Sequence, residues 1–395
     1  MKWASAVSTQ PRVRAAVDET IEAVTRQLEG NAPDLLIAFS TREYCPEQDR
    51  LLRLLRAAWP ETTVFGCSAS GVIGAGHEIE EERALSLTAA VLPGVALRAV
   101  HLEATELPPF YAERVMWESA LGVKTATDPQ FLVIADPFSF PTESFLRGLD
   151  RAFPQSTKVG GLASSALEPG GNVLLLGDKS YRSGAIVLAL CGNIHMSTVV
   201  AQGCRPIGEP YFVTSCHDNL LRELDGRSPR DVLAALFDKL SPRDRTLVEQ
   251  SLFIGIALPG ERHDVHAGDF LIRNVIGLDA QTGALWVGAE LQPNTVVQFH
   301  LRDALSSAQD LERALAGAGA PACPAGALLF SCVGRGTRLY GTPDHDSNAL
   351  RRHLGELPIG GFFCSGEIGP VQGMSQVHGY TSAVAIITPQ TRRPQ

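Results

Sequence analysis

Apolar and polar residues follow the same order in three separate stretches of the chain, at residues 34–93, 130–192 and 326–389. Each stretch begins with an apolar run and continues with a helix-spaced pattern that ends at a proline. A Gly/Ser-rich run and a second apolar run close it. Short apolar runs bounded by turn residues indicate strands, whereas apolar residues three and four positions apart indicate amphipathic helices. The pattern therefore predicts an internal duplication of a strand–helix–strand–strand unit.

The duplication makes a definite prediction about the fold. The predicted helices of the three stretches cover residues 51–59, 145–153 and 349–356. Val64, Val159 and Phe363 lie on the strands that follow and should occupy equivalent elements. Strand–helix–strand units favour parallel pairing, whereas hairpins require antiparallel pairing. We therefore expect an α/β to α+β fold in which helices flank mixed β-sheets.

The chain is also expected to form two domains, because 395 residues exceed one ordinary hydrophobic core. An N-terminal helix is predicted within residues 1–30, and a first domain with two repeat copies within residues 31–220. The second domain, residues 221–390, contains the third copy and a strand-rich, degenerate part. Strands are predicted in that part at residues 252–258, 269–278, 283–289 and 295–300.

Composition narrows the possible partners and the cellular compartment. The formal net charge of -9 argues against nucleic acid or an anionic membrane as the main partner. The N-terminal residues lack an apolar signal core and the longest apolar runs are strand-length, which indicates a soluble protein. The 8 cysteines form no CxxC pair, which is typical of reduced thiols in the cytoplasm. His263 and His266 resemble half of a metal site but have no second half, so no metal and no cofactor are expected.

The Gly/Ser-rich strand ends are the first candidate for a binding site. They contain the residues Gly66, Cys67, Ser68, Gly160, Gly161, Cys364 and Ser365. Free amides next to hydroxyl groups bind a carboxylate or a phosphate well. Residues this small also allow two chain segments to approach closely, so a crowded contact between repeat copies explains them equally well.

Two cysteines are predicted to occupy equivalent places in their copies, Cys67 in the first and Cys364 in the third. Either thiol, or Cys332, is a conceivable nucleophile with a histidine such as His77 or His378 as base. No acyl-transfer signature surrounds any of them, and small buried thiols are common in protein cores. We therefore expect Cys67 and Cys364 to be buried packing residues.

Charged residues near the Gly-rich segments complete the candidate set. Arg335, in the strand exit CVGRGTR, has the fork-shaped donors that suit a carboxylate, and Arg273 and Arg205 are further donors. Structural ion pairing explains the last two equally well. Glu367 and Glu78 are candidate acceptors for an ammonium group.

Several long segments together resemble the FIST family, named after F-box and intracellular signal transduction proteins. VFGCSASGVIGAGHEIEE, KVGGLAS and GCRPIGEPYFVT resemble the FIST N domain. FLIRNVIGLDAQTGALWVG, LLFSCVGRG and GFFCSGEIGP resemble the FIST C domain. The resemblance implies a sensory module for small ligands such as amino acids, which passes its signal to a downstream signalling protein.

The leading hypothesis is a non-enzymatic cytoplasmic sensor. It would bind a small metabolite, an amino acid or another carboxylate, in a pocket between the two domains and signal through a partner protein. The alternatives are a thiol-dependent hydrolase or transferase that uses Cys67, Cys364 or Cys332, and a protein-docking scaffold.

Overall fold

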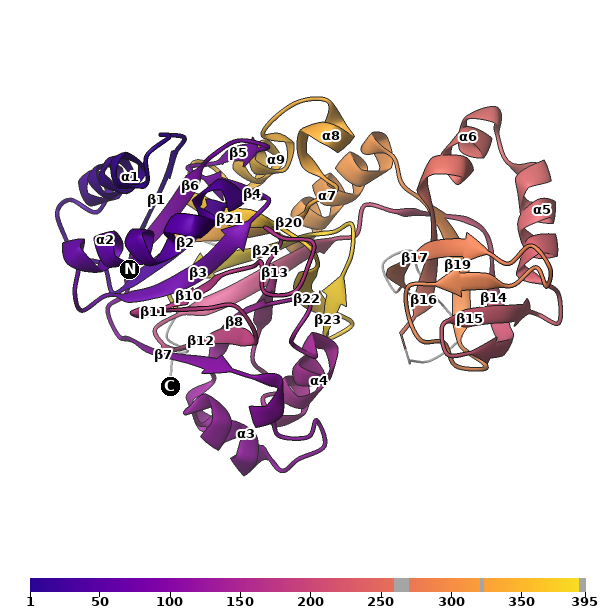
Figure 1. Ribbon diagram of the computed structural model, residues 1–395, viewed down its shortest axis with the longest axis horizontal. Coiled ribbons are helices and arrows are strands. Elements are labelled where there is room, and N and C mark those ends of the chain that lie inside the picture. The colour runs from indigo at the N-terminus through magenta and orange to yellow at the C-terminus, as the bar shows by residue number, and fades with distance from the viewer. Residues whose placement is uncertain (259–269, 320–322, 391–395) are drawn as a thin grey trace. The chain divides into compact units, whose positions relative to one another are not determined.

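The strands and helices divide into two compact units that are discontinuous in sequence. The computed structural model describes residues 1–258, 270–319 and 323–390 (Figure 1). The repeat unit contains Met1–Ala201, Glu312–Val377 and the segment from Thr381 onward, and the barrel unit contains Gln202–Leu311 and His378–Tyr380. In sequence, the barrel unit interrupts the third repeat copy.

The repeat unit contains three copies of one series of elements. The first copy runs β1 (Lys2–Ser8), α1 (Val13–Gln27), β2 (Leu35–Thr41), α2 (Gln48–Ala58), β3 (Thr63–Ala69), β4 (Gly71–Gly74), β5 (His77–Glu80) and β6 (Leu85–Val91). The second runs β7 (Val95–Leu102), α3 (Arg114–Leu121), β8 (Gln130–Ala135), α4 (Thr142–Ala152), β9 (Lys158–Leu162), β10 (Leu174–Leu176), β11 (Lys179–Tyr181) and β12 (Ala185–Gly192). The third runs β13 (His195–Ala201), α7 (Ala304–Ala318), β20 (Gly326–Cys332), α8 (Gly336–Tyr340), α9 (His345–Leu354), β21 (Ile359–Cys364), β22 (Glu367–Val371), β23 (Met374–His378) and β24 (Ser382–Thr388).

Each copy builds one sheet, and each sheet is completed by a hairpin from another copy. The strand orders are β1-β6-β2-β3-β10-β11, β7-β12-β8-β9-β22-β23 and β13-β24-β20-β21-β4-β5. In every sheet the two strands joined by the central helix pair in parallel and the others pair antiparallel. The first copy thus gives its hairpin to the third sheet, the second copy to the first sheet, and the third copy to the second sheet. We call this arrangement the hairpin exchange.

The predicted helices of the repeats are confirmed as α2, α4 and α9. Their apolar faces are buried, as Leu51 and Leu55 on α2 and Phe145 and Leu149 on α4 illustrate. Val64, Val159 and Phe363 lie on β3, β9 and β21, which hold the same place in their sheets. One apolar core joins the three copies, and within it the rings of Phe39 and Phe362 lie 4.7 Å apart.

The strand-rich part of the second half forms a closed barrel with the order β14-β15-β18-β17-β16-β19. Its strands are β14 (Arg205–His217), β15 (Leu220–Leu224), β16 (Leu252–Ala257), β17 (Phe270–Leu278), β18 (Leu285–Val287) and β19 (Val296–Leu301). Predicted strands are present at β16, β17 and β19, whereas β18 is shorter than expected. Two helices follow Ser-Pro pairs, α5 (Pro229–Lys239) and α6 (Pro242–Ser251), and Ser228 and Ser241 cap them by accepting a main-chain hydrogen bond.

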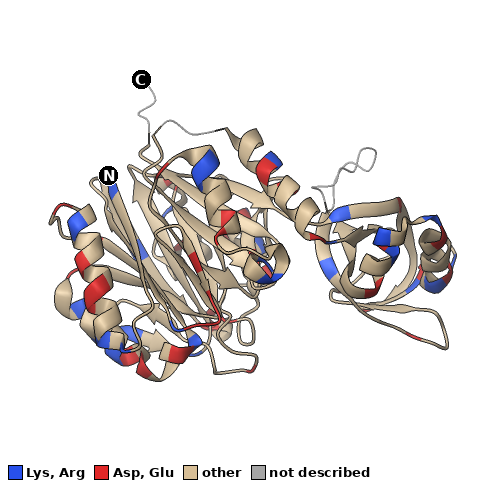
Figure 2. Ribbon diagram, turned by 90° about the horizontal axis from the view of Figure 1, so that it is seen from above, with Lys and Arg blue, Asp and Glu red and all other residues tan. Residues whose placement is uncertain are grey.

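Residues of both charge signs occur on the helices in the view of Figure 2. Among the described residues, no helix is long and apolar enough to cross a membrane. Within the same residues, no group of three or more His, Cys, Asp or Glu is arranged to hold a metal ion. His263 and His266 lie outside the described residues.

Candidate functional site

The three Gly/Ser-rich strand ends meet inside the repeat unit. The main-chain amide of Ser70, after β3, donates to the Ser164 hydroxyl at 3.0 Å. That hydroxyl in turn donates to the carbonyl oxygen of Phe363 on β21. Two main-chain bonds join β9 to the third copy, from Leu162 to the Gly366 oxygen at 2.8 Å and from Ser365 to the Leu162 oxygen at 3.1 Å. Segments far apart in sequence are thus brought together as one polar junction.

The glycines of these strand ends lie where two chain segments touch. A Cβ atom on Gly66 or on Gly160 would lie 1.8 Å from the carbonyl oxygen of the neighbouring strand. A Cβ atom on Gly161 would lie 2.3 Å from the Cys364 sulfur. Close packing within one copy therefore explains Gly66 and Gly160, and close packing between the second and third copies explains Gly161. A ligand-binding role for the three glycines stays a prediction.

The prediction that Cys67 and Cys364 are buried is confirmed, since neither side chain is exposed. Burial raises the pKa of both thiols well above the usual value. A cysteine nucleophile needs the opposite shift, toward the thiolate. The contacts of these two residues are therefore those of packing thiols.

The predicted equivalence of Cys67 and Cys364 is wrong by two positions. Gly66 and Gly361 share one place, because a Cβ atom on either would lie 1.8 Å from the oxygen of its parallel neighbour. Each also pairs with the hairpin strand from another copy. Counting from these glycines, Phe362 matches Cys67, and Cys364 lies two residues further along its strand. The alignment of the first and third copies is therefore determined by the glycines that the crowded backbone requires, and the cysteines do not occupy equivalent positions.

Ser68 takes part in a hydrogen-bond network at the end of β3 that includes one carboxyl group, that of Asp136. Its hydroxyl lies 2.7 Å from that of Ser165, which donates to the Asn172 side-chain oxygen at 2.9 Å. The amide group of Asn172 donates to Asp136 at 2.9 Å, and the Val173 amide donates to the Ser68 hydroxyl at 2.8 Å. All of these side chains except Val173 are polar and buried. The Ser68 hydroxyl is therefore already engaged by protein groups.

The third copy has a network with an ion pair at its centre, Arg335 and Asp346. Arg335, after β20, has no exposed surface, and Asp346, in the first turn of α9, is 1% exposed. The guanidinium group donates to Asp346 twice, from Nε at 2.7 Å and from the Nη2 atom at 3.1 Å. It also donates to the Tyr340 hydroxyl. The carboxylate that the sequence suggested for Arg335 is thus supplied from within the chain.

Further polar groups hold Asp346 in place. The hydroxyl groups of Ser382 and Ser331 donate to it at 2.5 and 3.2 Å, and the His345 Nδ1 atom lies 3.0 Å away. Burial opposes ionisation of Asp346, but Arg335 outweighs it and holds the pKa of the carboxyl group well below its usual range. The His345 ring stacks on the Tyr340 ring, with the two ring centroids 3.5 Å apart.

Glu78 reaches this network because of the hairpin exchange. It lies on β5 of the first copy, is 5% exposed, and accepts a hydrogen bond at 2.7 Å from the main-chain amide of Ser347 on α9. Burial, reinforced by the nearby negative charge of Asp346, raises the pKa of Glu78 to about 8. At neutral pH this carboxyl group is therefore mostly protonated. We call Glu78, Arg335, Tyr340, His345 and Asp346 the charged cluster.

The remaining candidates lie in different places. Glu367, on β22, is fully buried and accepts a hydrogen bond from the Thr381 amide at 3.1 Å. Ser365 is exposed. Arg205 and Arg273 belong to the barrel unit, where Arg205 contacts Asp244 and Asp303 and Arg273 donates to the Ile272 carbonyl at 3.1 Å.

Sequence reasoning missed Asp346, the acceptor at the centre of the charged cluster. Its position in the first turn of α9 gave a signal, since acidic residues favour helix N-termini. Many acidic residues at helix N-termini lie on the protein surface, so this preference does not predict a buried ion pair with Arg335.

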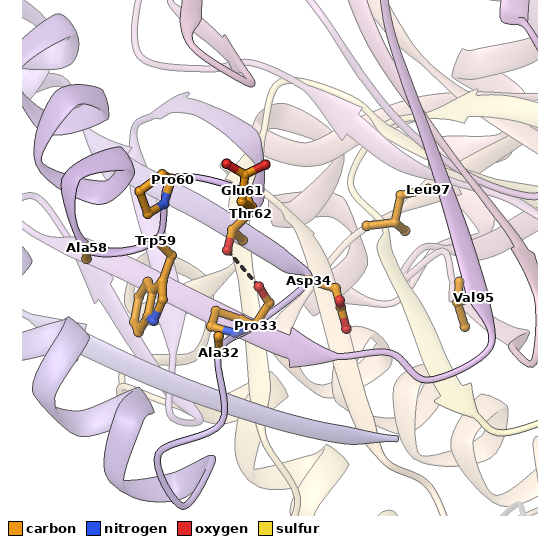
Figure 3. A pocket seen from close by; sticks show the side chains of 10 residues that line it. All are labelled: Ala32, Pro33, Asp34, Ala58, Trp59, Pro60, Glu61, Thr62, Val95 and Leu97. Atoms are coloured by element: carbon orange, nitrogen blue, oxygen red, sulfur yellow. Dashed lines mark hydrogen bonds between the residues drawn. The ribbon is translucent and has the colours of Figure 1, made fainter.

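The repeat unit also has an open hollow of about 420 Å³ at the amino ends of β2 and β3 (Figure 3). Its lining residues are Ala32, Pro33, Asp34, Ala58, Trp59, Pro60, Glu61, Thr62, Val95 and Leu97. None of them was a candidate from the sequence, because they are scattered among turns and a strand.

The chain is similar to curated mycobacterial proteins over nearly its whole length. It is 35% identical over 394 residues to an uncharacterized protein of Mycobacterium tuberculosis (strain ATCC 25618 / H37Rv), covering 98% of this chain and 99% of that protein. It is 33% identical over 388 residues to an uncharacterized protein of Mycobacterium bovis, covering 98% of each. Among solved structures, the cyanuric acid hydrolase from A. caulinodans aligns over 98% of this chain and 99% of that chain, with 12% identity and a TM-score of 0.34. At this score the likeness supports no inference about activity.

The family models divide the chain in sequence. The FIST N domain matches residues 34–227, and the FIST C domain matches residues 230–370. The charged cluster draws on both, because Glu78 lies in the first match and Arg335 and Asp346 lie in the second. The chain belongs to the FIST family.

Proposed function

We propose that the protein is a sensory module that binds an amino acid at the charged cluster and reports its presence to a partner protein. The observation that carries the proposal is the buried Arg335–Asp346 pair, which lies beside a second buried carboxyl group, that of Glu78. Burying ionised groups is costly, and replacing such pairs by apolar residues often stabilises a fold. Selection for a binding role explains why the cluster is there.

Charge favours an amino acid over a simple carboxylate. The Arg335 guanidinium group faces the Asp346 carboxylate, and two more carboxylates lie at the border of the cluster: Glu80 accepts from the Thr337 amide at 2.8 Å, and Asp344 accepts from the Glu78 amide at 2.6 Å. A simple anion would meet a net negative surrounding, whereas a zwitterion can place its carboxylate at Arg335 and its ammonium group at the acidic residues. In this arrangement the ligand carboxylate competes with Asp346 for the guanidinium group.

Access for a ligand would come from movement of α8. This helix has five residues, and the glycines at its ends, Gly336 and Gly341, have φ angles of 66° and 70°. Glycine adopts such angles without strain and allows the chain to turn there. Because Tyr340 is the last residue of α8, displacement of this helix would move the Tyr340 ring away from His345 and its hydroxyl group away from Arg335.

The same geometry provides a route for a signal. Glu78 belongs to a hairpin of the first copy, and Ser347 and Asp346 belong to α9 of the third. A ligand that exchanges with Asp346 would alter the contact between these elements and so the surface offered to a downstream signalling protein. The free thiols of all eight cysteines support a reducing, cytoplasmic setting for this module.

Binding can be tested by thermal unfolding with the standard L-amino acids added one at a time. A bound ligand stabilises the fold by about 2.7 kcal/mol at a hundredfold excess over its Kd. For a polar amino acid that raises the Tm, the matched amine without the carboxylate should raise it less.

Two conservative variants assign the effect to the cluster. Arg335→Lys keeps the charge but loses the two-pronged contact, so it should weaken binding by about tenfold or more. Arg205→Lys makes the same change in the barrel unit and should bind as the unmodified protein does. Failure of every amino acid to raise the Tm, or an unchanged Kd in Arg335→Lys, would remove the cluster as the site.

A further inference from the structure

The hollow of Figure 3 is separate from the charged cluster. It lies at the amino ends of the parallel strands β2 and β3, whereas the Gly/Ser-rich segments follow the carboxyl ends of such strands. Val95 and Leu97 on β7 form its other side. Its volume of about 420 Å³ is in the range of pockets for small organic ligands.

The lining combines apolar surface with negative charge only. Trp59 and Pro60 lie on one side and Val95 and Leu97 on the other, with Asp34 between them (Figure 3). Asp34 and Glu61 contribute carboxyl groups, and the lining contains no lysine, arginine or histidine. Arg56 lies close by and donates to the Thr62 main-chain oxygen at 3.0 Å, but it does not line the hollow.

Hydrogen bonds hold the walls of the hollow in a fixed arrangement. One carboxylate oxygen of Asp34 accepts from the Leu92 amide at 2.6 Å, and the Asp34 main-chain oxygen accepts from Thr63 at 3.1 Å. The Thr62 hydroxyl donates to the Pro33 oxygen at 2.6 Å, a bond drawn in Figure 3. The Trp59 oxygen accepts from the Thr62 amide at 3.3 Å. The site is therefore formed before any ligand arrives.

We propose that this hollow binds a small organic ammonium ion with an aromatic or branched apolar body. The apolar body would displace water from Pro33, Val95 and Leu97, which favours binding in proportion to the buried area. The ammonium group would lie near the Asp34 and Glu61 carboxylates, where charge-assisted hydrogen bonds are strong. The Trp59 ring adds the attraction of an indole face for a cation. A carboxylate ligand would face repulsion from both acidic residues.

Two probes of matched size and opposite charge test the proposal. Calorimetric titration of the full chain with 2-phenylethylammonium chloride should give saturable binding with one site. Sodium 3-phenylpropionate has the same ring and a chain of similar length but a negative charge, and it should bind at least about tenfold more weakly, given two opposing carboxylates. Because the first probe has no carboxylate, its binding does not depend on the amino-acid site.

Substitutions then locate the probe. Asp34→Asn and Glu61→Gln should each weaken binding of the ammonium probe about threefold, the usual effect of an exposed charge pair, and the double variant about tenfold. Trp59→Leu should weaken it about fivefold. Glu168→Gln removes an exposed carboxylate elsewhere and should leave the Kd unchanged.

Each of three results would overturn the proposal. The first is the lack of saturable binding of the ammonium probe at millimolar concentration. The second is equal affinity for the two probes, since that would remove the charge argument. The third is unchanged affinity in the Asp34→Asn/Glu61→Gln double variant, since the probe would then bind elsewhere.

Discussion

The repeat unit and the barrel unit both bury ionisable side chains, but they do so in different ways. The repeat unit encloses Arg335, Asp346 and Glu78 as interacting groups with several hydrogen bonds. In the barrel unit, His300 has no exposed surface, and its Nδ1 atom lies 3.0 Å from the Gln298 main-chain oxygen. Among the described residues, the Nε2 atom of His300 has no hydrogen-bond partner. Burial lowers the pKa of His300 to about 4, so it is neutral in the folded barrel.

Two arginines, Arg335 in the repeat unit and Arg205 in the barrel unit, show the same difference in burial. Arg335 is fully buried against one carboxylate, whereas the Arg205 side chain is 33% exposed and lies between Asp244 and Asp303. Exposed ion pairs contribute little to stability because water screens them. A buried pair tolerates the loss of one partner poorly, since the remaining charge is left without compensation. The comparison of the two units therefore indicates that the burial of an arginine, more than its membership of an ion pair, determines how much its loss destabilises the fold.

The largest expected effect comes from breaking the buried pair. Arg335→Ala leaves the Asp346 carboxylate buried without its counter-charge and should lower the free energy of unfolding by about 3–5 kcal/mol. Arg205→Ala in the barrel unit should lower it by less than about 1 kcal/mol. Urea unfolding at pH 7 measures both. The double variant Arg335→Ala/Asp346→Ala should recover part of the loss, and equal effects of the two single variants would erase the contrast.

A second prediction concerns Glu78 and pH. The pKa of Glu78 is raised to about 8 by burial, from 4.5, so the folded state binds this proton more tightly than the unfolded state. The stability from protonated Glu78 is present below pH 4.5 and is lost as the pH rises to about 8. Glu78→Gln should remove this loss, so its free energy of unfolding should exceed that of the unmodified protein by about 4 kcal/mol at pH 8.5 and by less than about 1 kcal/mol at pH 5. A parallel pH dependence of unfolding in the two proteins would contradict the assignment.

The barrel unit should respond to pH in the opposite direction. The His300 pKa is lowered to about 4, from 6.5, so its contribution to stability is present above pH 6.5 and is lost as the pH falls to 4. The loss should be about 2 kcal/mol, and hydrogen exchange of the β19 amides at pH 7 and pH 4.5 measures it. His300→Phe should lack the acid-dependent part of the exchange. Equal acid sensitivity in variant and unmodified protein would assign the effect to another group.

The sequence predicted the parts of the fold that rest on local periodicity. The helices α2, α4 and α9 were predicted because apolar residues recur at helical spacing over their turns. The strands β16, β17 and β19 were predicted because each contains an apolar run of six to nine residues. The strands β10 and β11, with three residues each, are too short to show a period. Their pairing with the sheet of another copy depends on contacts between distant residues, which no local pattern reports.

The site was predictable only in part, for a related reason. Arg335 and Glu78 were found because charged residues next to Gly-rich strand ends are unusual. Their proximity follows from the pairing of β4 with β21, which the sequence did not reveal. The register of the copies was misjudged because the cysteines were aligned, whereas the glycines are the residues that the neighbouring carbonyl oxygens require.

The hairpin exchange has a consequence for how the chain folds as it is synthesised. The hairpin β4–β5 leaves the ribosome early, but its partner β21 emerges only after the barrel residues have been made. The second sheet likewise lacks β22 and β23 until the last part of synthesis. Nascent chains of this protein therefore expose unpaired strand edges for most of translation, a state that invites aggregation and chaperone binding. A chain that ends after the FIST N match keeps the pairs β4–β5 and β8–β9 but lacks β21 and β22, so one edge of β4 and one edge of β9 stay unpaired until the FIST C residues are made.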